Sequence, residues 1–354
     1  MTRYSDIDTP AILIDLDKAE ANLERAQAAA DRAGLKLRPH IKTHKLPYFA
    51  KRQIELGAVG ITVQKLGEAE VMADAGLSDL LLTFNIIGSA KLSRLKALHE
   101  RVMIRVVADS VECIIGLAAT FADTDHPLGV FIECDTGMGR CGVQSPDAAL
   151  TLARLVDAAP GLNFAGLMTY PAAGKYAAAN QWLADAKALF GADNLPIPVI
   201  TTGGTPDIWH MQDAAGIATE YRPGTYIYMD RSQVAAGAAS YEDCALTVLA
   251  TVVSRPTENR AIIDAGSKAL TSDLLGLFGH GYVIEYPQAK IVALSEEHGT
   301  LDLSDCVNKP MIGETIRIIP NHCCPVSNLF DRVNLVRNGD LVQTLEVAAR
   351  GRVD

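Results

Sequence analysis

The chain has 354 residues, 49% of them hydrophobic, and a formal net charge of −10 at pH 7. This length predicts two domains, or one large barrel with an appendage. The negative charge argues against nucleic acid or an anionic membrane as the main partner. No apolar run approaches the roughly 20 residues that a membrane span needs. Seven cysteines, an odd number, suit a reducing compartment. Because the polar start from Met1 to Asp8 resembles no signal peptide, we expect a cytoplasmic protein.

Short apolar runs alternate with amphipathic stretches through the first two thirds of the chain. A strand over 11–14 and a helix over 16–33 come first. Eight further strands are expected at 35–38, 60–63, 79–83, 102–107, 129–133, 164–168, 198–201 and 220–222. Helical patterns lie between them at 47–55, 66–75, 90–99, 110–118, 146–158, 177–190 and 206–214. Strands separated by helices in this way predict a (β/α)8 barrel with a closed parallel sheet.

The pattern changes at about Ser240, after which helices become scarce. Apolar runs with turns between them lie at 248–253, 260–263, 289–293, 315–319 and 332–337. They predict a smaller, C-terminal antiparallel β domain. The expected domains are a barrel over residues 16–235 and a β domain built from residues 1–15 plus 236–354. The strand over 11–14 precedes the barrel, and the pattern alone leaves open which domain it joins.

Polar residues gather where the barrel strands end, which is the rim where barrel enzymes place their active sites. The first strand is followed by Lys42, with His40 and His44 beside it, and the second by Gln64. Neighbouring positive charge and partial burial lower the pKa of a lysine, and a neutral amine reacts with aldehydes. A solvated basic loop, or a phosphate clamp, is the alternative reading of this segment.

Two glycine-containing loops follow the seventh and eighth strands. One contains Thr202, Gly203, Gly204 and Thr205, and the other Gly224, Thr225 and Tyr226. Backbone amides and hydroxyls at the start of a helix favour a phosphate, and barrel phosphate sites commonly use these two loops. Neither loop is a Walker loop or a dinucleotide fingerprint.

A rim lysine together with a phosphate cradle predicts pyridoxal 5'-phosphate as cofactor, with Lys42 holding the aldehyde. Arg140 lies on the glycine-rich turn after the fifth strand and is a candidate donor to the cofactor's phenolic oxygen or to a substrate carboxylate. Tyr170, after the sixth strand, is a candidate hydrogen-bond partner for the pyridine nitrogen. Core packing is an alternative role for this tyrosine.

A second cluster, His322 with Cys324, follows the strand expected at 315–319. On an extended chain, residues two apart face the same side, so an imidazole and a thiolate would converge. Two protein ligands suit an open divalent-metal site completed by water or substrate. Adjacent cysteines are also often simply buried.

These residues resemble a known family, the D-threonine aldolase and eukaryotic-type D-serine dehydratase group on the alanine-racemase-like fold (fold type III). The similar segments are 9–11, 38–45, 135–140, 202–206, 222–226, 264–269 and 320–325. The resemblance implies a Schiff-base role for Lys42, a metal site at His322 and Cys324 holding Mn²⁺ or Zn²⁺, and a homodimer. One departure is the absence of a histidine shortly after Tyr170, where some members carry one.

The implied activity is a metal-dependent lyase reaction that cleaves a D-β-hydroxy-α-amino acid, of the D-threonine type, to glycine and an aldehyde. Lys42 and His322 are the expected catalytic residues. The alternative is a D-serine or D-3-hydroxyaspartate dehydratase on the same scaffold. An amino-acid racemase and a non-catalytic pyridoxal-phosphate-binding homeostasis protein are further readings. The missing histidine leaves open which base takes the proton of the substrate hydroxyl.

Overall fold

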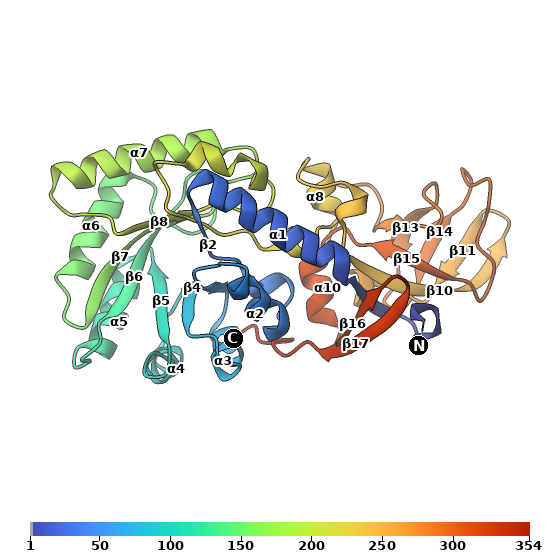
Figure 1. The fold of residues 1–354 in the computed structure, drawn as a ribbon, viewed down its shortest axis with the longest axis horizontal. Coiled ribbons are helices and arrows are strands. Elements are labelled where there is room, and N and C mark those ends of the chain that lie inside the picture. Colours follow the sequence, from blue (N-terminus) through green and yellow to red (C-terminus); the bar gives the residue numbers. More distant parts are fainter. Residues whose placement is uncertain (1–2) are drawn as a thin grey trace. The chain divides into compact units, whose positions relative to one another are not determined.

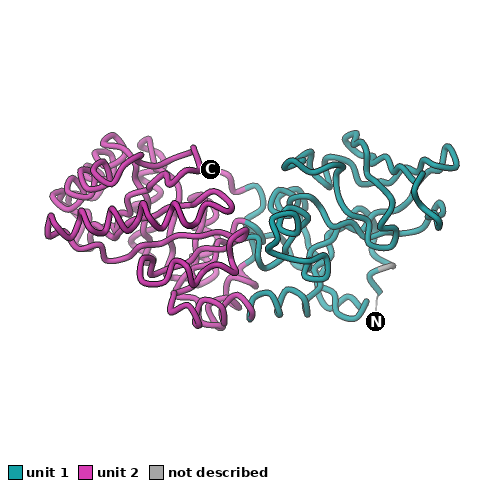
Figure 2. The backbone as a smooth tube through the Cα atoms, turned by 90° about the horizontal axis from the view of Figure 1, so that it is seen from above, with its two compact units in different colours: residues 1–24, 43–46, 225–351 teal, residues 25–42, 47–224, 352–354 magenta. Residues whose placement is uncertain are grey.

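The structure, a computed structural model, describes residues 3–354, so Met1 and Thr2 of the expected β domain lie outside the described residues. The chain forms two compact units, which Figure 2 shows in different colours. The barrel unit comprises residues 25–42, 47–224 and 352–354. The β unit comprises the chain up to Glu24 together with residues 43–46 and 225–351.

Eight parallel strands form the sheet of the barrel unit. They are β2 (Lys36–Leu37), β3 (Ile61–Val63), β4 (Asp79–Asn85), β5 (Met103–Ala108), β6 (Leu128–Cys134), β7 (Leu162–Thr169), β8 (Val199–Thr202) and β9 (Glu220–Tyr221). Their order is β2-β9-β8-β7-β6-β5-β4-β3, and a parallel bridge between His40 and Thr62 links the two ends of this series. The predicted (β/α)8 barrel is therefore confirmed.

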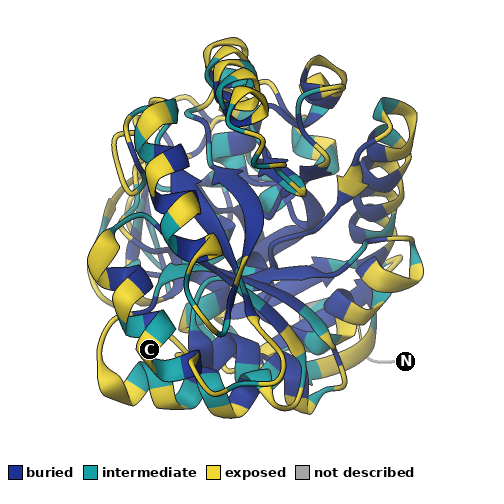
Figure 3. Cartoon of the chain, turned by 90° about the vertical axis from the view of Figure 1, so that its left-hand side faces the viewer, coloured by how far each residue is buried: buried dark blue, intermediate teal, exposed yellow. Residues whose placement is uncertain are grey.

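Both faces of these strands are buried, which explains why the sequence shows continuous apolar runs instead of alternation. In β4, for example, Leu80, Leu81 and Leu82 are all buried. Leu81 packs in one cluster with Val107 and Phe131 from the next two strands. Figure 3 shows the buried strands at the centre and exposed faces on the surrounding helices.

Helices connect the strands around the barrel (Figure 1). They are α1 (Leu16–Ala33), α2 (Pro47–Glu55), α3 (Leu66–Asp74), α4 (Ser89–His99), α5 (Val111–Phe121), α6 (Pro146–Asp157) and α7 (Tyr176–Ala192). Ser110 and Ser145 cap α5 and α6 by accepting hydrogen bonds from the amides of Cys113 and Ala148. These caps explain why the sequence located both helix starts closely.

The prediction of a regular helix over 206–214 is wrong. The structure has a 3-10 segment there, η3 (Ile208–Ala214), interrupted at His210, whose φ of −103° and ψ of 17° are not helical. Four shorter 3-10 segments are η1 (Tyr4–Asp6), η2 (Ile41–Thr43), η4 (Thr225–Ile227) and η5 (Tyr241–Asp243).

The β unit contains a second, mainly antiparallel sheet, as predicted. Its strands are β1 (Ala11–Asp15), β10 (Leu246–Thr257), β11 (Arg260–Ile263), β12 (Tyr282–Val283), β13 (Lys290–Leu294), β14 (Gly299–Asp302), β15 (Thr315–Ile319), β16 (Arg332–Arg337) and β17 (Asp340–Glu346). Strand β1 lies between β10, which is antiparallel to it, and β16, which is parallel. The first strand of the chain therefore belongs to this sheet and not to the barrel.

Three short helices complete the β unit: α8 (Arg231–Ala235), α9 (Ser267–Leu270) and α10 (Cys323–Leu329). Helix α10 follows β15 closely and carries the second candidate cluster. Among residues 3–354, no helix has both the length and the apolar character needed to cross a membrane.

Candidate active site

Lys42 lies in η2, shortly after β2 reaches the rim of the barrel, and it is half-buried. Its backbone amide donates to Nδ1 of the buried His40 at 3.3 Å, so the proton of a neutral His40 is on Nε2. That Nε2 lies 3.0 Å from Oε1 of Gln64, whose own amide donates to the carbonyl of Thr83 at 2.8 Å. This chain of hydrogen bonds fixes the backbone that carries Lys42.

The loop after β8 leaves no space for side chains at its two glycines. Gly203 has a φ of +90°, and a Cβ atom there would overlap the ring of Tyr221. A Cβ atom on Gly204 would lie 2.8 Å from Cε2 of Tyr170. In the described part of the chain, the amides of Gly203 and Gly204 donate to no acceptor. Two adjacent amides without an acceptor are donors of the kind that bind anions in proteins.

The loop after β9 is tied to the loop after β8. The amide of Gly224 donates to Oγ1 of the buried Thr205 at 3.3 Å. The buried Arg222 donates to Oγ1 of Thr201 at 2.9 Å and to the carbonyl of Thr169. Thr202, at the end of β8, accepts the amide of Arg222 at 2.9 Å. Within the barrel unit, Gly224 is thus held beside the loop after β8, whereas Thr225 and Tyr226 of the second predicted loop belong to the β unit.

Arg140 and Tyr170 come together although they lie on different loops. The guanidinium carbon of Arg140 is 5.4 Å from the centre of the Tyr170 ring, a cation–π contact. The loop that bears Arg140 is built around Asp135, whose carboxylate accepts the amides of Gly137 and Met138 at 3.0 and 2.8 Å. The hydrogen bonds to Asp135 therefore fix the conformation of the turn that carries Arg140.

A buried charge network below the rim was not predicted. Arg38 donates to both carboxylate oxygens of Glu220, at 3.0 and 3.1 Å, and to Asp79 at 2.6 Å. Burial lowers the pKa of Arg222 to about 10, against the opposing charges of Glu220 and Glu133. An arginine at the end of a predicted apolar strand, as at Arg38, was a visible signal, but its partner Glu220 lies 182 residues away in the chain.

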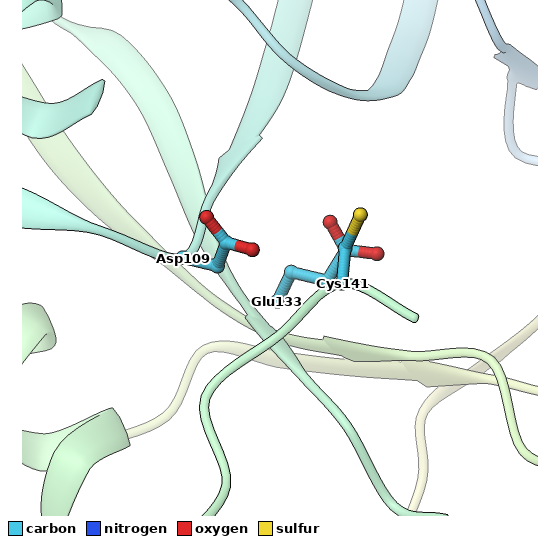
Figure 4. A group of neighbouring side chains, drawn as sticks. All are labelled: Asp109, Glu133 and Cys141. Carbon is cyan, nitrogen blue, oxygen red and sulfur yellow. The ribbon is translucent and has the colours of Figure 1, made fainter. Parts of the chain in front are cut away.

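Glu133 is a second feature that sequence reasoning missed, although a glutamate within an apolar strand is a signal of its own. Burial raises the pKa of Glu133 to about 7, with Arg140 opposing the shift and Asp109 adding to it. Figure 4 shows Asp109, Glu133 and Cys141 together, with candidate ligand atoms within 4.8 Å of one another. This is the one group of three or more such side chains among residues 3–354.

In the β unit, His322 and Cys324 are brought together as predicted, but by a different backbone. His322 is extended and directly precedes α10, so Cys324 lies in the first helical turn and not on a strand. The two side chains are nevertheless close enough for Cys324 to stabilise the charged imidazole of His322. Helix formation starts immediately after His322, which turns the thiol back toward the imidazole.

Two carboxylates flank His322 within the β unit. Nδ1 of His322 lies 3.3 Å from Oδ2 of Asp273, and Asp230 accepts the amide of Cys323 at 2.9 Å. Burial disfavours the charged imidazole, but contacts with Cys324, Asp230 and Asp273 outweigh it and raise the pKa of His322 to about 9. The donor set is one imidazole and one thiol with carboxylates around them.

Two threonines approach the thiol of Cys324. Oγ1 of Thr43 lies 3.2 Å from Sγ, and Oγ1 of Thr225 lies 3.6 Å from it. Thr225, predicted as a phosphate contact, is thus placed beside the thiol in the β unit. Its neighbour Tyr226 is fully buried in η4.

The fold and these side chains define a class of protein: a rim-lysine barrel with two adjacent glycine amides suited to an anion, followed in the same chain by a β unit that carries an imidazole–thiol pair. The chain matches the family model "Alanine racemase, N-terminal domain" over residues 14–232 and belongs to that family. Residues 245–336 match a second model, "Putative serine dehydratase domain".

Several known proteins are similar to this chain over nearly its whole length. D-threonine aldolase of Arthrobacter sp is 34% identical over 98% of this chain and 93% of its own. D-threo-3-hydroxyaspartate dehydratase of Delftia sp. is 33% identical over 96% of this chain and 97% of its own. The crystal structure of D-threonine aldolase from Filomicrobium marinum superposes with a TM-score of 0.91 and 33% identity, covering 99% of this chain and 98% of that one.

Proposed function

We propose that this chain is a pyridoxal-phosphate- and divalent-metal-dependent aldolase that cleaves D-β-hydroxy-α-amino acids of the D-threonine type to glycine and an aldehyde. The observation that supports it most is the similarity to a D-threonine aldolase over 98% of the chain. The segment that matches the first family model includes Lys42 and Arg140, and the segment that matches the second includes His322 and Cys324.

The barrel unit fits pyridoxal phosphate. The unused amides of Gly203 and Gly204, with no Cβ atom above them, would hold the phosphate together with Thr202 and Thr205. Lys42 would hold the aldehyde carbon on a backbone braced by His40 and Gln64. The remaining phosphate-loop contacts that the sequence suggests are Gly224, which belongs to the barrel unit, and Thr225 and Tyr226, which belong to the β unit.

Two further contacts set the electronic state of the cofactor. Arg140 would donate to its phenolic oxygen, and Tyr170, which stacks against that guanidinium, would contact the pyridine nitrogen. A neutral phenol leaves the pyridine nitrogen without a full positive charge. When bound, pyridoxal phosphate supplies a ring that accepts the electron pair of a broken bond at Cα, and the protein decides which bond breaks.

The His322–Cys324 pair fits a divalent ion, because an imidazole and a thiolate are ligands for Zn²⁺ and related metals. With Asp273 facing Nδ1, the imidazole is oriented in the way that metal-binding histidines usually are. Two protein ligands leave positions open for the β-hydroxyl of the substrate. Such an ion, Mn²⁺ or Zn²⁺, would be held by His322 and Cys324 and would lower the pKa of a hydroxyl bound to it.

These assignments divide the work between the barrel, residues 16–235, which binds the cofactor, and the β domain, residues 1–15 plus 236–354, which binds the metal. We also propose a homodimer located in the cytoplasm, in line with the family. A second candidate function is a D-serine or D-3-hydroxyaspartate dehydratase. The 33% identity to the Delftia dehydratase favours it specifically.

Product analysis tests the proposal. Purified protein is supplied with pyridoxal phosphate and Mn²⁺ or Zn²⁺ and incubated with D-threonine, D-serine and D-3-hydroxyaspartate. Acetaldehyde and glycine from D-threonine, lost on chelation and restored by the metal, is the expected result. A 2-oxo acid and ammonia would instead establish the dehydratase. Cofactor binding without conversion of any D-amino acid would contradict both.

Matched variants assign the residues. Lys42→Ala should abolish both the visible absorbance of the bound cofactor and turnover, whereas Lys51→Ala, on the exposed face of α2, should change neither. His322→Ala and Cys324→Ala should abolish metal-dependent turnover but keep the visible band, and the exposed His298→Ala is the control. A visible band that persists in Lys42→Ala would contradict the lysine assignment.

A further inference from the structure

A buried carboxylate without a hydrogen-bond donor lies in the barrel unit, on the strand that leads to Arg140. Glu133 is 5% exposed. Among residues 3–354, no group donates a hydrogen bond to its carboxylate and no cationic nitrogen lies within 4.0 Å of it. Its side chain lines a cavity and lies among other charged groups, an arrangement that is typical of residues with a specific role.

Backbone hydrogen bonds bring the Arg140 loop back onto Glu133. The loop leaves β6 at Cys134 and returns at Val143, whose amide donates to the carbonyl of Glu133 at 2.9 Å. Val143 in turn accepts the amide of Asp135 at 3.0 Å. Arg140 therefore lies on a closed loop whose base is Glu133 itself.

The two side chains share one cavity of about 450 Å³. Glu133 and Arg140 both line it, together with Gln64, the residue that braces His40. Arg140 also contacts the ring of Tyr170. The guanidinium thus has an aromatic ring beside it and a buried acid within the same cavity.

The charges around Glu133 come from several elements. Arg140 and Arg222 are the cations that act on it, and Asp109 and Asp135 are the anions. The thiol of Cys141 also lies close. Burial and the neighbouring anions raise the pKa of Glu133 to about 7, so its charge changes in the neutral range.

We propose that Glu133 is a positioning residue whose negative charge, acting across the shared cavity and without direct contact, orients the guanidinium of Arg140 toward the cofactor's phenolic oxygen and balances its positive charge. The inference rests on the proposed function, since it assumes that Arg140 contacts pyridoxal phosphate. Glu133 itself touches neither cofactor nor substrate in this assignment. It acts through Arg140, by orientation and by charge.

This arrangement has a spectroscopic consequence. Removing the negative charge leaves Arg140 uncompensated, and the stronger positive potential makes titrating groups of the bound cofactor lose their protons at a lower pH. The visible absorbance of the bound cofactor reports that protonation state directly. Its pH midpoint is a readout that a purely structural role for Glu133 would leave unchanged.

The experiment compares holoenzyme variants in the presence of a chelator, so that no cation on the group in Figure 4 contributes. Absorbance spectra are recorded from about pH 5.5 to 9.5 for wild type, Glu133→Gln, Glu133→Asp and Asp109→Asn. Glu133→Gln should lower the midpoint of the visible band by about one pH unit. Glu133→Asp, which keeps the charge, should restore most of the wild-type value.

Asp109→Asn is the matched control, because it removes one carboxylate charge from the same group. Its shift should be less than half that of Glu133→Gln, and combining Glu133→Gln with Arg140→Ala should reduce the Glu133 effect by more than half. Equal shifts in the two single variants, or no midpoint change in Glu133→Gln, would overturn the positioning role. A wild type that forms no visible band would instead overturn the proposed function.

Discussion

The hydroxyl of Thr43 lies 3.2 Å from the thiol of Cys324, although 281 residues separate the two in the chain. Thr43 directly follows the rim residue Lys42 and is itself fully buried. Thr43, which follows the proposed cofactor lysine in the chain, thus contacts Cys324 of the proposed metal pair. A hydroxyl at this distance can donate to a thiolate and stabilise its negative charge.

Thr43→Val should weaken metal binding, because valine has the shape of threonine but no hydroxyl to donate to Cys324. We expect a loss in metal affinity of about tenfold or more, typical of removing an outer partner of a metal ligand. Isothermal titration with Zn²⁺ measures it. Thr43→Ser keeps the hydroxyl and should bind nearly as well as wild type, and equal losses in both variants would show that the methyl group matters instead.

Gly203→Ala should lower the free energy of unfolding more than the same substitution at a glycine of an ordinary turn. The matched control is Gly216→Ala, whose φ of +80° is similar to the +90° of Gly203 but whose added Cβ would meet nothing within 4 Å. Both variants lose about 1 kcal/mol of stability to the left-handed backbone. Gly203→Ala should lose about 1–3 kcal/mol more by overlap with Tyr221.

Urea unfolding of the two glycine variants measures this difference. Titration with pyridoxal phosphate should show weakened binding in Gly203→Ala alone. Unchanged cofactor affinity in that variant would place the phosphate elsewhere.

Arg38→Ala should be far more destabilising than Arg94→Ala, although both arginines pair with a glutamate through two hydrogen bonds. Arg38 and Glu220 are buried, whereas the side chains of Arg94 and Glu70 are each 32% exposed. Removing Arg38 leaves the buried carboxylate of Glu220 without its ion-pair partner, which costs about 3–5 kcal/mol. The exposed pair contributes about 1 kcal/mol or less. Chemical denaturation measures both, and equal losses would argue against an uncompensated buried charge.

Stability of the cofactor-free protein should fall with rising pH because of Glu133. The folded pKa of about 7 exceeds the ordinary glutamate value of 4.5, so between these pH values the folded protein keeps a proton that the unfolded chain has released. Stability is therefore lost as pH rises through that window. The shift corresponds to roughly 3 kcal/mol.

Glu133→Gln cannot ionise and should lack this contribution. The difference in unfolding free energy between Glu133→Gln and wild type, measured in urea at several pH values, should grow across the window in favour of glutamine. A constant difference would show that the acid is ionised throughout.

Local patterns predicted most of the barrel. The helix over 16–33 was located to the residue, since apolar spacing and cap residues act within a few turns. The helix expected over 206–214 was wrong because the chain kinks at His210, which no periodicity reports. The expected domain division placed the strand over 11–14 in the β domain, but the strand pattern alone left this open, because its partners β10 and β16 lie more than 200 residues away.

The candidate residues show the same division. The sequence pointed to several candidate site residues because each is an unusual side chain, or a glycine, that follows a predicted strand. They include Lys42, Arg140, Gly203 and His322. Glu133 was not singled out, since its burial beside Arg140 depends on a loop that folds back through Val143.

The sequence by itself determined the alternation of strands and helices, the rim lysine and the imidazole–thiol motif, because these follow from periodicity and from residue types at short spacing. Only the tertiary structure decided that Arg38 pairs with Glu220, that Glu133 is buried without a donor and that Thr43 reaches Cys324. The physical reason is that hydrogen bonds and burial depend on distance in space. A local sequence pattern does not report contacts between residues that are far apart in the chain.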